Sequence, residues 1–275
     1  EANRNGIETR VSYFDHIVAS EILTTKGPAS AITANNVFAH VDDLVEITQG
    51  VRSLLAPDGV FVFEVSYLAD VIEKTLFDTI YHEHLSYHSV EPLERFFEAH
   101  GMEMIGAYRV MTHGGSLRVC CQLKGGPHAI DGNVVKDLIT RERKLGLNRV
   151  TTYKKFASDI DTIKNKLYSL LTRLKSEGKS IAAYGAPAKA TTLMYHFRIG
   201  PEIIDYIVDD SPLKQSLYSP GFHIPVVASD VIYKEPPDYL VVLAWNFVDS
   251  IIKNHSRYQE SGGQFIVPLP TLKIV

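Results

Sequence analysis

One short segment, residues 77–88, concentrates the side chains that act in acid–base chemistry. It reads FDTIYHEHLSYH and contains three histidines, two tyrosines and two acids. Histidine titrates near neutral pH and tyrosine can donate a hydrogen bond to a carbonyl oxygen, so the segment favours general acid–base catalysis. Two alternatives stay open. His82 and His84, two residues apart on a strand, would present both imidazoles on one face as metal ligands, and a surface loop that is merely rich in histidine has the same composition.

Two further positions lie where predicted strands end. His40 is the last residue of the segment ANNVFAH, just past a predicted strand end. In a doubly wound sheet such a position faces the ligand. The alternative is that His40 caps or packs before the helix that starts at Asp42. In residues 184–189 (YGAPAK), a strand, a glycine turn and a helix amino-terminus together favour an anion. Lys189 could add a charge for a phosphate. Without an anion it would oppose the helix dipole, which favours anion contact over a simple tight junction.

Two polar pairs follow later strands. Asp209 and Asp210 could accept hydrogen bonds from ribose hydroxyls, or they could cap the turn at Ser211. Trp245 and Asn246 could form a stacking platform or a packed cap. The pattern favours neither alternative in either pair.

Alternating strands and helices must position these residues. Apolar–polar alternation and short apolar runs predict strands at 7–13, 30–36, 60–65, 102–110, 116–123, 180–184, 203–208, 239–243 and 263–267. Helical stripes predict helices at 42–55, 90–100 and 188–197, and helices through most of 134–175. The fold class is therefore α/β, with a Rossmann-like pattern in 1–126, a helical bridge over 127–178, and a second Rossmann-like domain over 179–275.

Composition excludes several classes of protein. The chain has 275 residues, of which 45% are hydrophobic and 22% charged, as in ordinary globular domains. A net charge of -4 gives no electrostatic footprint for nucleic acid. Cys120 and Cys121 are adjacent, so they form neither a disulfide framework nor a cysteine-based zinc site. No apolar run has the length of a membrane span. These features predict a protein of the reducing cytoplasm, without membrane or nucleic-acid partners.

Six segments, in order along the chain, resemble the sugar C-methyltransferases that install branches on nucleotide-linked deoxysugars. They are ANNVFAH (34–40), FDTIYHEHLSY (77–87), THGGSLRV (112–119), AAYGAPAKA (182–190), VDDSPLKQSLYSPGFHIPV (208–226) and VLAWNF (242–247). The resemblance covers nearly the whole chain. It implies an enzyme that depends on S-adenosylmethionine and acts on a nucleotide-diphosphate keto sugar, with thymidine diphosphate as the expected nucleotide.

The same resemblance implies three parts: a cysteine-rich zinc domain, a central methyl-donor domain and a carboxyl-terminal Rossmann-like lobe. This sequence departs from that plan. It has no Cys-x-x-Cys pairs, no Gly-rich loop that opens the donor fold, and no acidic residue after a second strand. We therefore expect residues 1–126 to form an incomplete class I methyltransferase domain. The chain, which begins without Met, is expected either to be a fragment of a longer protein or to have its missing part supplied separately. Zinc is expected only in the missing amino-terminal domain.

The resemblance also implies roles for individual residues. His84 would be the base that removes a proton beside the sugar ketone, Tyr81 and Glu83 would orient the sugar or its enolate oxygen, and His40 would be a second polar group at the reaction. Methyl-donor contacts are expected at Asn35, Asn36, Phe14 and Asp15. Sugar-nucleotide contacts are expected at His82, Tyr87, His113, Tyr184, Gly185 and Lys189, with Gly185 and Lys189 at the diphosphate, and no residue is expected to bind a metal in this chain.

Two other functions remain open at this point. A non-catalytic nucleotide-sugar-binding fragment would bind sugar without methyl transfer. A metal-dependent hydrolase would use His82 and His84 with a carboxylate and would contain a bound ion.

Overall fold

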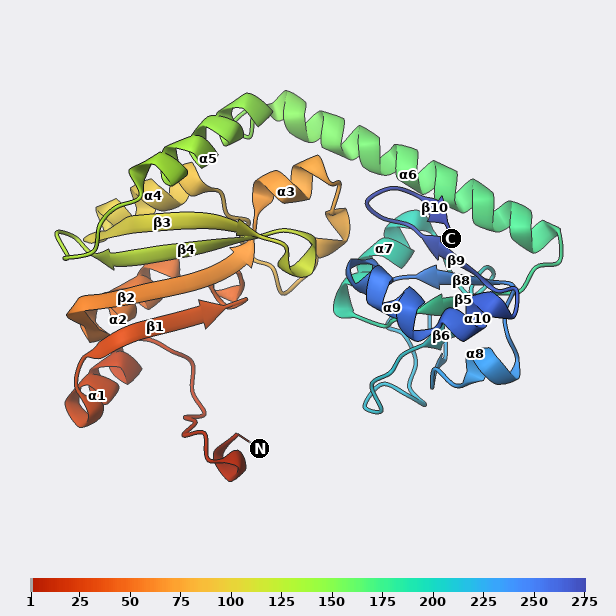
Figure 1. Ribbon diagram of the computed structural model, residues 1–275, viewed down its shortest axis with the longest axis horizontal. Helices are drawn as coiled ribbons and strands as arrows, with labels where there is room; N and C mark the ends of the chain where they lie inside the picture. The colour runs from red at the N-terminus through yellow and green to blue at the C-terminus, as the bar shows by residue number, and fades with distance from the viewer. Residues whose placement is uncertain (1) are drawn as a thin grey trace. The chain divides into compact units, whose positions relative to one another are not determined.

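A computed structural model describes residues 2–275, and the chain forms two compact units (Figure 1). Unit 1 comprises the chain up to Leu68 together with Leu85–Gly146. Unit 2 comprises Ala69–His84 together with Leu147–Val275. The short segment 69–84 therefore interrupts unit 1 in sequence but belongs to unit 2. This segment carries residues 77–84 of the acid–base cluster, including Tyr81 to His84.

Unit 1 is built on a mixed sheet with the strand order β1-β2-β4-β3 among the described residues. Strand β1 runs parallel to β2, whereas β4 is antiparallel to both β2 and β3. The strands are β1 (Ala29–Asn35), β2 (Leu55–Ser66), β3 (Met102–Val110) and β4 (Ser116–Leu123). The helices are η1 (Asn3–Asn5), α1 (His16–Lys26), η2 (Phe38–His40), α2 (Leu44–Leu54), α4 (Val90–Ala99), η4 (Thr112–Gly114) and α5 (Gly132–Leu145). Helices α4 and α5 pack beside β3, and α1 packs on α2 (Figure 1).

An aromatic cluster forms the centre of unit 1. Phe61 and Phe63 point to the same face of β2 because side chains alternate along a strand, and their rings lie 5.3 Å apart. Phe38 is fully buried and lies 4.7 Å from Phe63, while Phe97 of α4 closes the cluster at 5.6 Å from Phe63. Phe38 comes two residues after Asn36 and two before His40. Burial of this ring therefore fixes the loop that carries both candidate residues.

Unit 2 contains a second mixed sheet with the order β10-β9-β8-β5-β6-β7 among the described residues. All its pairings are parallel except that of β10 with β9. The strands are β5 (Ile181–Tyr184), β6 (Ile207–Val208), β7 (Val226–Val227), β8 (Tyr239–Val242), β9 (Gln264–Val267) and β10 (Lys273–Ile274). The helices are α3 (Leu68–Glu73), η3 (Phe77–Thr79), α6 (Val150–Ser176), α7 (Ala188–Phe197), α8 (Val231–Lys234), η5 (Trp245–Phe247), α9 (Val248–Asn254) and α10 (Ser256–Glu260).

The sheet of unit 2 is buried on both faces. Ile181 and Ala183 of β5 belong to one hydrophobic cluster, with α6 and α7, and Ala182 and Tyr184 belong to another, with α8, α9 and α10. Strands covered on both sides read as continuous apolar runs, as the strand sequences IAAY and YLVV do. Phe77 joins the first cluster, so the segment before the YHEH motif is part of the core of unit 2.

Several predicted elements are confirmed, the strand predicted at 203–208 is shortened to Ile207–Val208, and one element is wrong. The strands at 102–110 and 116–123 and the helix at 188–197 have the predicted bounds. The strand predicted at 7–13 is absent from the described structure: these residues form an irregular segment in which Val11 and Tyr13 are 96% and 95% exposed. Alternation favours a strand only when one face is buried, and here neither face is. Helix α1 follows directly and was not predicted, since it buries only Val18 and Ala19 and lacks an apolar stripe.

No helix in residues 2–275 combines the length and the apolar character that crossing a bilayer requires.

His88 makes the stability of unit 1 sensitive to acid. Its ring is buried, lies 5.6 Å from that of Phe38, and has Nε2 3.0 Å from the hydroxyl of Ser86. Burial lowers the pKa of His88 from 6.5 to about 4. The unfolded chain therefore binds a proton between these two pH values that the folded unit excludes. The corresponding stability is present above pH 6.5 and is lost as the pH falls towards 4.

We expect acidification through this window to lower the free energy of unfolding of unit 1 by about 3 kcal/mol. Hydrogen exchange of the amides of β2 and β4 measures this loss, because both strands lie in unit 1. In His88→Gln, whose side chain cannot titrate, acidification should lower the free energy of unfolding by about 3 kcal/mol less than in the wild type. An unchanged pH dependence in the variant would contradict the assignment to His88.

Candidate active site

The YHEH motif follows a short 3-10 turn, η3, that is fixed in the core of unit 2. Phe77 starts this turn, and its ring stacks on Phe197 of α7 at 4.8 Å. The N–H of Ile80 donates to the carbonyl of Phe77 at 2.9 Å, and the N–H of His84 donates to the carbonyl of Tyr81 at 3.0 Å. Two consecutive turns therefore give the motif a defined backbone.

A backbone carbonyl orients the ring of His84. Its Nδ1 lies 2.7 Å from the carbonyl oxygen of Thr79. A carbonyl oxygen only accepts hydrogen bonds, so Nδ1 must carry the hydrogen, and a neutral imidazole then has its lone pair on Nε2. The Tyr81 ring lies 4.6 Å from the His84 ring and limits its rotation. This arrangement selects the tautomer in which Nε2 is the basic atom.

Tyr81 is set up to donate a hydrogen bond. Its side chain is half-buried, and burial, the negative charge of Glu83 and a hydrogen bond to the Glu83 side chain raise the pKa of Tyr81. The phenol stays protonated at neutral pH, and when its hydrogen turns away from Glu83 it can donate to an oxygen on which negative charge develops. His82 and Glu83 are exposed. Within residues 2–275 there is no group of three or more His, Cys, Asp or Glu side chains placed to hold a metal ion.

Asp78, within the turn η3, forms a buried ion pair with Lys189 of α7. The Asp78 side chain is fully buried, and its Oδ2 accepts a hydrogen bond from Trp245 Nε1 at 2.5 Å. Lys189 Nζ lies 3.5 Å from the same oxygen and 3.8 Å from the centroid of the Trp245 ring. Burial raises the pKa of Asp78 and lowers that of Lys189, and the attraction between the two charges opposes both shifts. Lys189 was predicted to contact a diphosphate; here its charge is compensated by Asp78.

Unit 1 brings together two residues that sequence reasoning treated separately. Asn36 and His113 both have left-handed backbone, with φ of 54° and 53°, a conformation that is uncommon outside glycine. Asn36 Nδ2 and His113 Nε2 lie 3.3 Å apart. The N–H of Asn36 also donates to the carbonyl of Glu64 at 2.9 Å, across the end of the parallel pair β1 and β2. Asn36 and its neighbour Asn35 are exposed there, at the strand end where such sheets bind ligands.

Sequence reasoning missed a buried carboxylate beside this pair. Glu64 of β2 is 5% exposed; it accepts a hydrogen bond from the hydroxyl of Thr112, and two from Arg118, at 3.1 and 2.8 Å. Burial alone would raise the pKa of Glu64, but Thr112 and Arg118 lower it, so the carboxylate stays charged. The available signal was one acid within the apolar run VFVFEV. Glu64 thus fixes the turn η4 that carries His113.

The remaining residues predicted in unit 1 have distinct surroundings. His40 is exposed at the end of η2, and the N–H groups of Leu85 and Ser86 donate to the carbonyl of Ala39, the residue before it, at 2.9 and 3.2 Å. Tyr87 is half-buried.

Phe14 and Asp15 pack locally. Asp15 caps α1 by accepting from the N–H of Val18 at 2.7 Å. The Phe14 ring lies so close to Gly50 of α2 that a Cβ on this glycine would be 3.0 Å from it. Both side chains therefore have structural roles, and their predicted contact with adenine stays a prediction.

At the carboxyl edge of the second sheet, a chain of hydrogen bonds links Tyr184 to a surface carboxylate. The Tyr184 hydroxyl lies 2.6 Å from Asp210 Oδ2 and 2.7 Å from His255 Nε2, and the Tyr233 hydroxyl lies 2.6 Å from His255 Nδ1. The carboxylate can only accept, so Tyr184 donates to it, His255 Nε2–H donates to Tyr184, and Tyr233 donates to Nδ1. Burial lowers the pKa of His255, in keeping with this neutral ring. Tyr184 is itself buried, so Asp210 is the exposed end of the chain.

The glycine turn of unit 2 is occupied by Asp209. Its Oδ2 accepts from the N–H of Ala186 at 2.7 Å and lies 3.2 Å from Lys214 Nζ. Burial opposes the charge, but these donors and the N–H of Ser211 lower the pKa of Asp209. The two alternatives for Asp209 were a contact with ribose hydroxyls and a cap of the turn at Ser211. The structure shows the cap of that turn. The predicted contact of a diphosphate with the Gly185 turn remains a prediction, in competition with this internal carboxylate.

Gly185 is required by its backbone and by its neighbour. Its φ is +90°, and a Cβ would lie 2.6 Å from the Cβ of Ala244. Gly178 has a similar φ of +78° but no described heavy atom within 4 Å of a Cβ. Both Gly→Ala changes introduce left-handed strain, and only Gly185→Ala adds a clash.

We expect Gly185→Ala to lower the free energy of unfolding by about 1–3 kcal/mol more than Gly178→Ala. Urea unfolding followed by the fluorescence of Trp245, the single tryptophan, measures this; equal losses would contradict the close packing.

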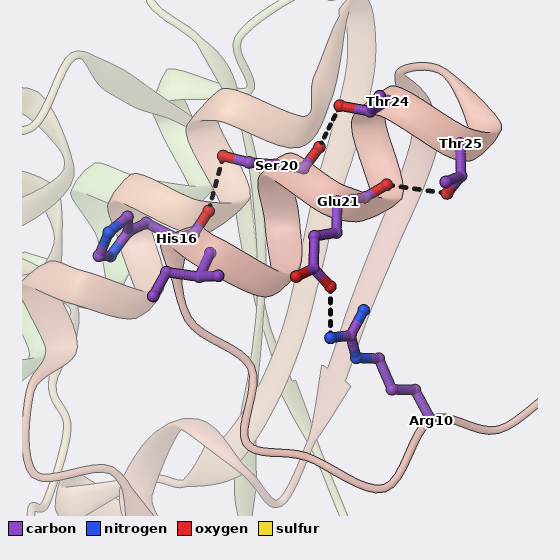
Figure 2. Close-up of a pocket in the computed structure, with 7 residues that line it drawn as sticks. Arg10, His16, Ser20, Glu21, Thr24 and Thr25 are labelled. Carbon is purple, nitrogen blue, oxygen red and sulfur yellow. Dashed lines mark hydrogen bonds and ion pairs between the residues drawn. The ribbon is translucent and has the colours of Figure 1, made fainter.

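A surface groove of unit 1 lies away from the predicted residues. It has a volume of about 550 Å³ and runs along α1 and the segment before it (Figure 2). It is lined by Arg10, His16, Ile17, Ser20, Glu21, Thr24 and Thr25. Figure 2 shows Arg10 paired with Glu21, and both side chains are about half exposed. None of the predicted catalytic or binding residues lines this groove.

Comparison with known proteins defines the class. Residues 2–106 match a family model described as a methyltransferase domain, and residues 111–270 match one described as the C-methyltransferase C-terminal domain. The second match covers more than half of the chain, and the chain belongs to this C-methyltransferase family. A curated relative, C-methyltransferase NovU of Streptomyces niveus, is 35% identical over 274 residues, which is 100% of this chain and 65% of NovU.

Solved structures give weaker similarities. A SAM-dependent methyltransferase of Anabaena variabilis has a TM-score of 0.32 at 14% identity and covers 40% of this chain and 56% of its own. Magnesium protoporphyrin IX methyltransferase of Synechocystis, with bound SAH, has a TM-score of 0.29 at 11% identity and covers 38% of this chain and 48% of its own.

Proposed function

We propose that the protein transfers a methyl group from S-adenosylmethionine to a carbon beside the ketone of a nucleotide-linked keto-deoxysugar. Membership of the C-methyltransferase family and the full-length match to part of NovU support methyl transfer to carbon. The observation that carries the proposal is the 2.7 Å contact between His84 Nδ1 and the Thr79 carbonyl, because it gives Nε2 the lone pair of a base. Carbon needs such a base: it becomes nucleophilic only after a proton beside a ketone is removed.

His84 and Tyr81 divide the chemistry of proton removal. His84 Nε2 takes the proton from the carbon beside the ketone, and the electron pair of the C–H bond moves to the ketone oxygen as an enolate. The ring is then an imidazolium, and its Nδ1–H keeps donating to Thr79. Tyr81 is protonated at neutral pH, and its hydroxyl hydrogen turns from Glu83 to donate to the enolate oxygen. Glu83, exposed beside Tyr81, orients a sugar hydroxyl.

Residues of unit 1 serve the methyl donor. The exposed amides of Asn35 and Asn36 lie at the carboxyl end of a parallel strand and offer donors and acceptors that suit the polar groups of a nucleoside, so the residues fit this cofactor. When bound, S-adenosylmethionine supplies the electrophilic methyl group. His40 acts as a second polar group in the same reaction. His82, Tyr87 and His113 remain the proposed contacts of the sugar nucleotide.

An assay with methyl-labelled S-adenosylmethionine and a thymidine-diphosphate keto-deoxysugar tests the proposal on the full-length protein. We expect label on a carbon beside the ketone. The matched control is the same sugar nucleotide with the ketone reduced to an alcohol, which has no acidic C–H and should accept no methyl group. Absence of transfer to the ketone by the wild-type protein would refute the proposed function, and equal labelling of the alcohol would refute the enolate.

A further inference from the structure

Helix α7 presents one face to the turn that precedes the YHEH motif. Lys189, Thr192 and His196 are spaced at i, i+3 and i+7, so they lie on the same side of the helix. Lys189 pairs with Asp78, the Thr192 hydroxyl donates to the carbonyl of Ile80 at 3.2 Å, and the His196 ring lies 5.3 Å from that of Phe77. The helix thus contacts three of the four residues from Phe77 to Ile80.

The buried polar group at the centre of this face is poorly explained by stability alone. Asp78 Oδ2 has two partners, Trp245 and Lys189, but the equally buried Oδ1 makes no hydrogen bond with the described residues. A buried oxygen without a partner costs free energy, and apolar side chains of similar volume often replace a buried ion pair without loss of stability. Such a group is therefore better explained by the conformation that it enforces.

That conformation bears on His84. Asp78 is followed directly by Thr79, whose carbonyl accepts the hydrogen bond from His84 Nδ1. The carbonyl can point at the imidazole only while the turn 77–79 keeps its position. Trp245 and Lys189 contact the turn through Asp78. In the sequence, Trp245 lies 167 residues after Asp78 and Lys189 lies 111 residues after it.

We propose that Asp78, Lys189 and Trp245 are positioning residues for the proton-abstracting His84: they fix the turn whose Thr79 carbonyl sets the tautomer of its imidazole. The inference rests on the proposed function of His84 as a base. It gives the GAPAK and VLAWNF segments a role within unit 2, because Lys189 belongs to the first and Trp245 to the second. None of the three side chains contacts the reacting atoms in this scheme.

Two variants test the proposal: Asp78→Asn keeps the volume of its side chain, and Trp245→Phe reduces it. Asp78→Asn removes the charge, and Trp245→Phe keeps an aromatic ring for Lys189 but removes the N–H donor. We expect kcat for methyl transfer to fall about 100-fold in Asp78→Asn, since small misplacement of a catalytic group has effects of this size, with KM for both substrates unchanged. Thr192→Val, on the same face of α7 but bonded to the carbonyl of Ile80 and not to Asp78, is the matched control and should retain wild-type kcat.

Nitrogen NMR of histidine-labelled protein gives a readout that needs no methyl transfer. Wild-type His84, assigned by loss of its signals in His84→Asn, should show hydrogen on Nδ1, and both variants should show a mixture of tautomers. A merely structural cluster would lower thermal stability and leave this pattern unchanged. Wild-type tautomer and kcat in folded Trp245→Phe would overturn the proposal, even if Asp78→Asn fails to fold. If the wild-type protein transfers no methyl group, the proposed function fails, and the NMR pattern alone decides the positioning role.

Discussion

Replacement of His84 by asparagine is expected to lower kcat for methyl transfer by about 100- to 10,000-fold, the range for loss of a general base. Asparagine is informative because its amide nitrogen lies near the position of the imidazole Nδ1 and can still donate to the Thr79 carbonyl. The variant therefore keeps the orienting hydrogen bond, which is 2.7 Å long in the wild type, and removes only the basic nitrogen. The rate is measured with labelled donor at saturating concentrations of both substrates.

His84→Gln is the matched control. Glutamine places its amide nearer the position of Nε2, so it loses both the base and the bond to Thr79. Equal loss of kcat in the two variants with unchanged KM would mean that the base matters more than the orientation of the ring. Wild-type kcat in His84→Asn would contradict the assignment of the base, while leaving the C-methyltransferase family of the chain untouched.

The second large effect concerns stability. Lys189→Met removes the cation from a pair whose carboxylate, Asp78, is fully buried. A buried charge without its partner typically costs about 3–5 kcal/mol, so the variant should lose that much of the free energy of unfolding of unit 2. Urea unfolding followed by tryptophan fluorescence measures the loss. The single tryptophan, Trp245, donates to Asp78 and therefore reports directly on the altered cluster.

The double variant Asp78→Asn with Lys189→Met separates charge from packing. It removes both charges and keeps similar volumes, and we expect it to recover most of the stability lost in Lys189→Met. A double variant less stable than Lys189→Met would show that the pair itself, and not the isolated carboxylate, dominates the energetics. A loss below about 1 kcal/mol in Lys189→Met would place Asp78 in the range of surface ion pairs, against its burial in the structure.

The fold follows from the sequence wherever apolar residues recur with a clear period. Strands β3 and β4 and helix α7 have such a period and the predicted bounds. The prediction was poorer where burial is set by distant neighbours. The apolar run 203–208 contains only the short strand Ile207–Val208, because the N–H groups of Ile203 and Ile204 both donate to the Gly200 carbonyl in a turn. Local sequence does not show which backbone groups a turn will use.

In the candidate site, too, the local sequence indicates a requirement but not the distant residue that meets it. A lysine in the first turn of α7 opposes the helix dipole, and on this ground the sequence favours an anion near Lys189. The structure places the carboxylate of Asp78 there, and contact of Lys189 with a diphosphate stays a prediction. The two residues are more than a hundred positions apart, and nothing in the local pattern of either one indicates the other. The roles of His84, Tyr81, Glu83 and His40 stay predictions that the experiments above address.

The open side of β1 has a consequence for handling residues 1–275 as an isolated polypeptide. The strand pairs with β2 along one edge, and no other described strand lies along the other. Its sequence, ASAITAN, has no charged residue and no proline, the two features that usually protect a sheet edge from adding a foreign strand. A polypeptide limited to residues 1–275 is expected to self-associate through this edge as its concentration rises, which light scattering over a dilution series detects. A lysine at Thr33, an exposed position of the strand, should raise the concentration at which this association begins.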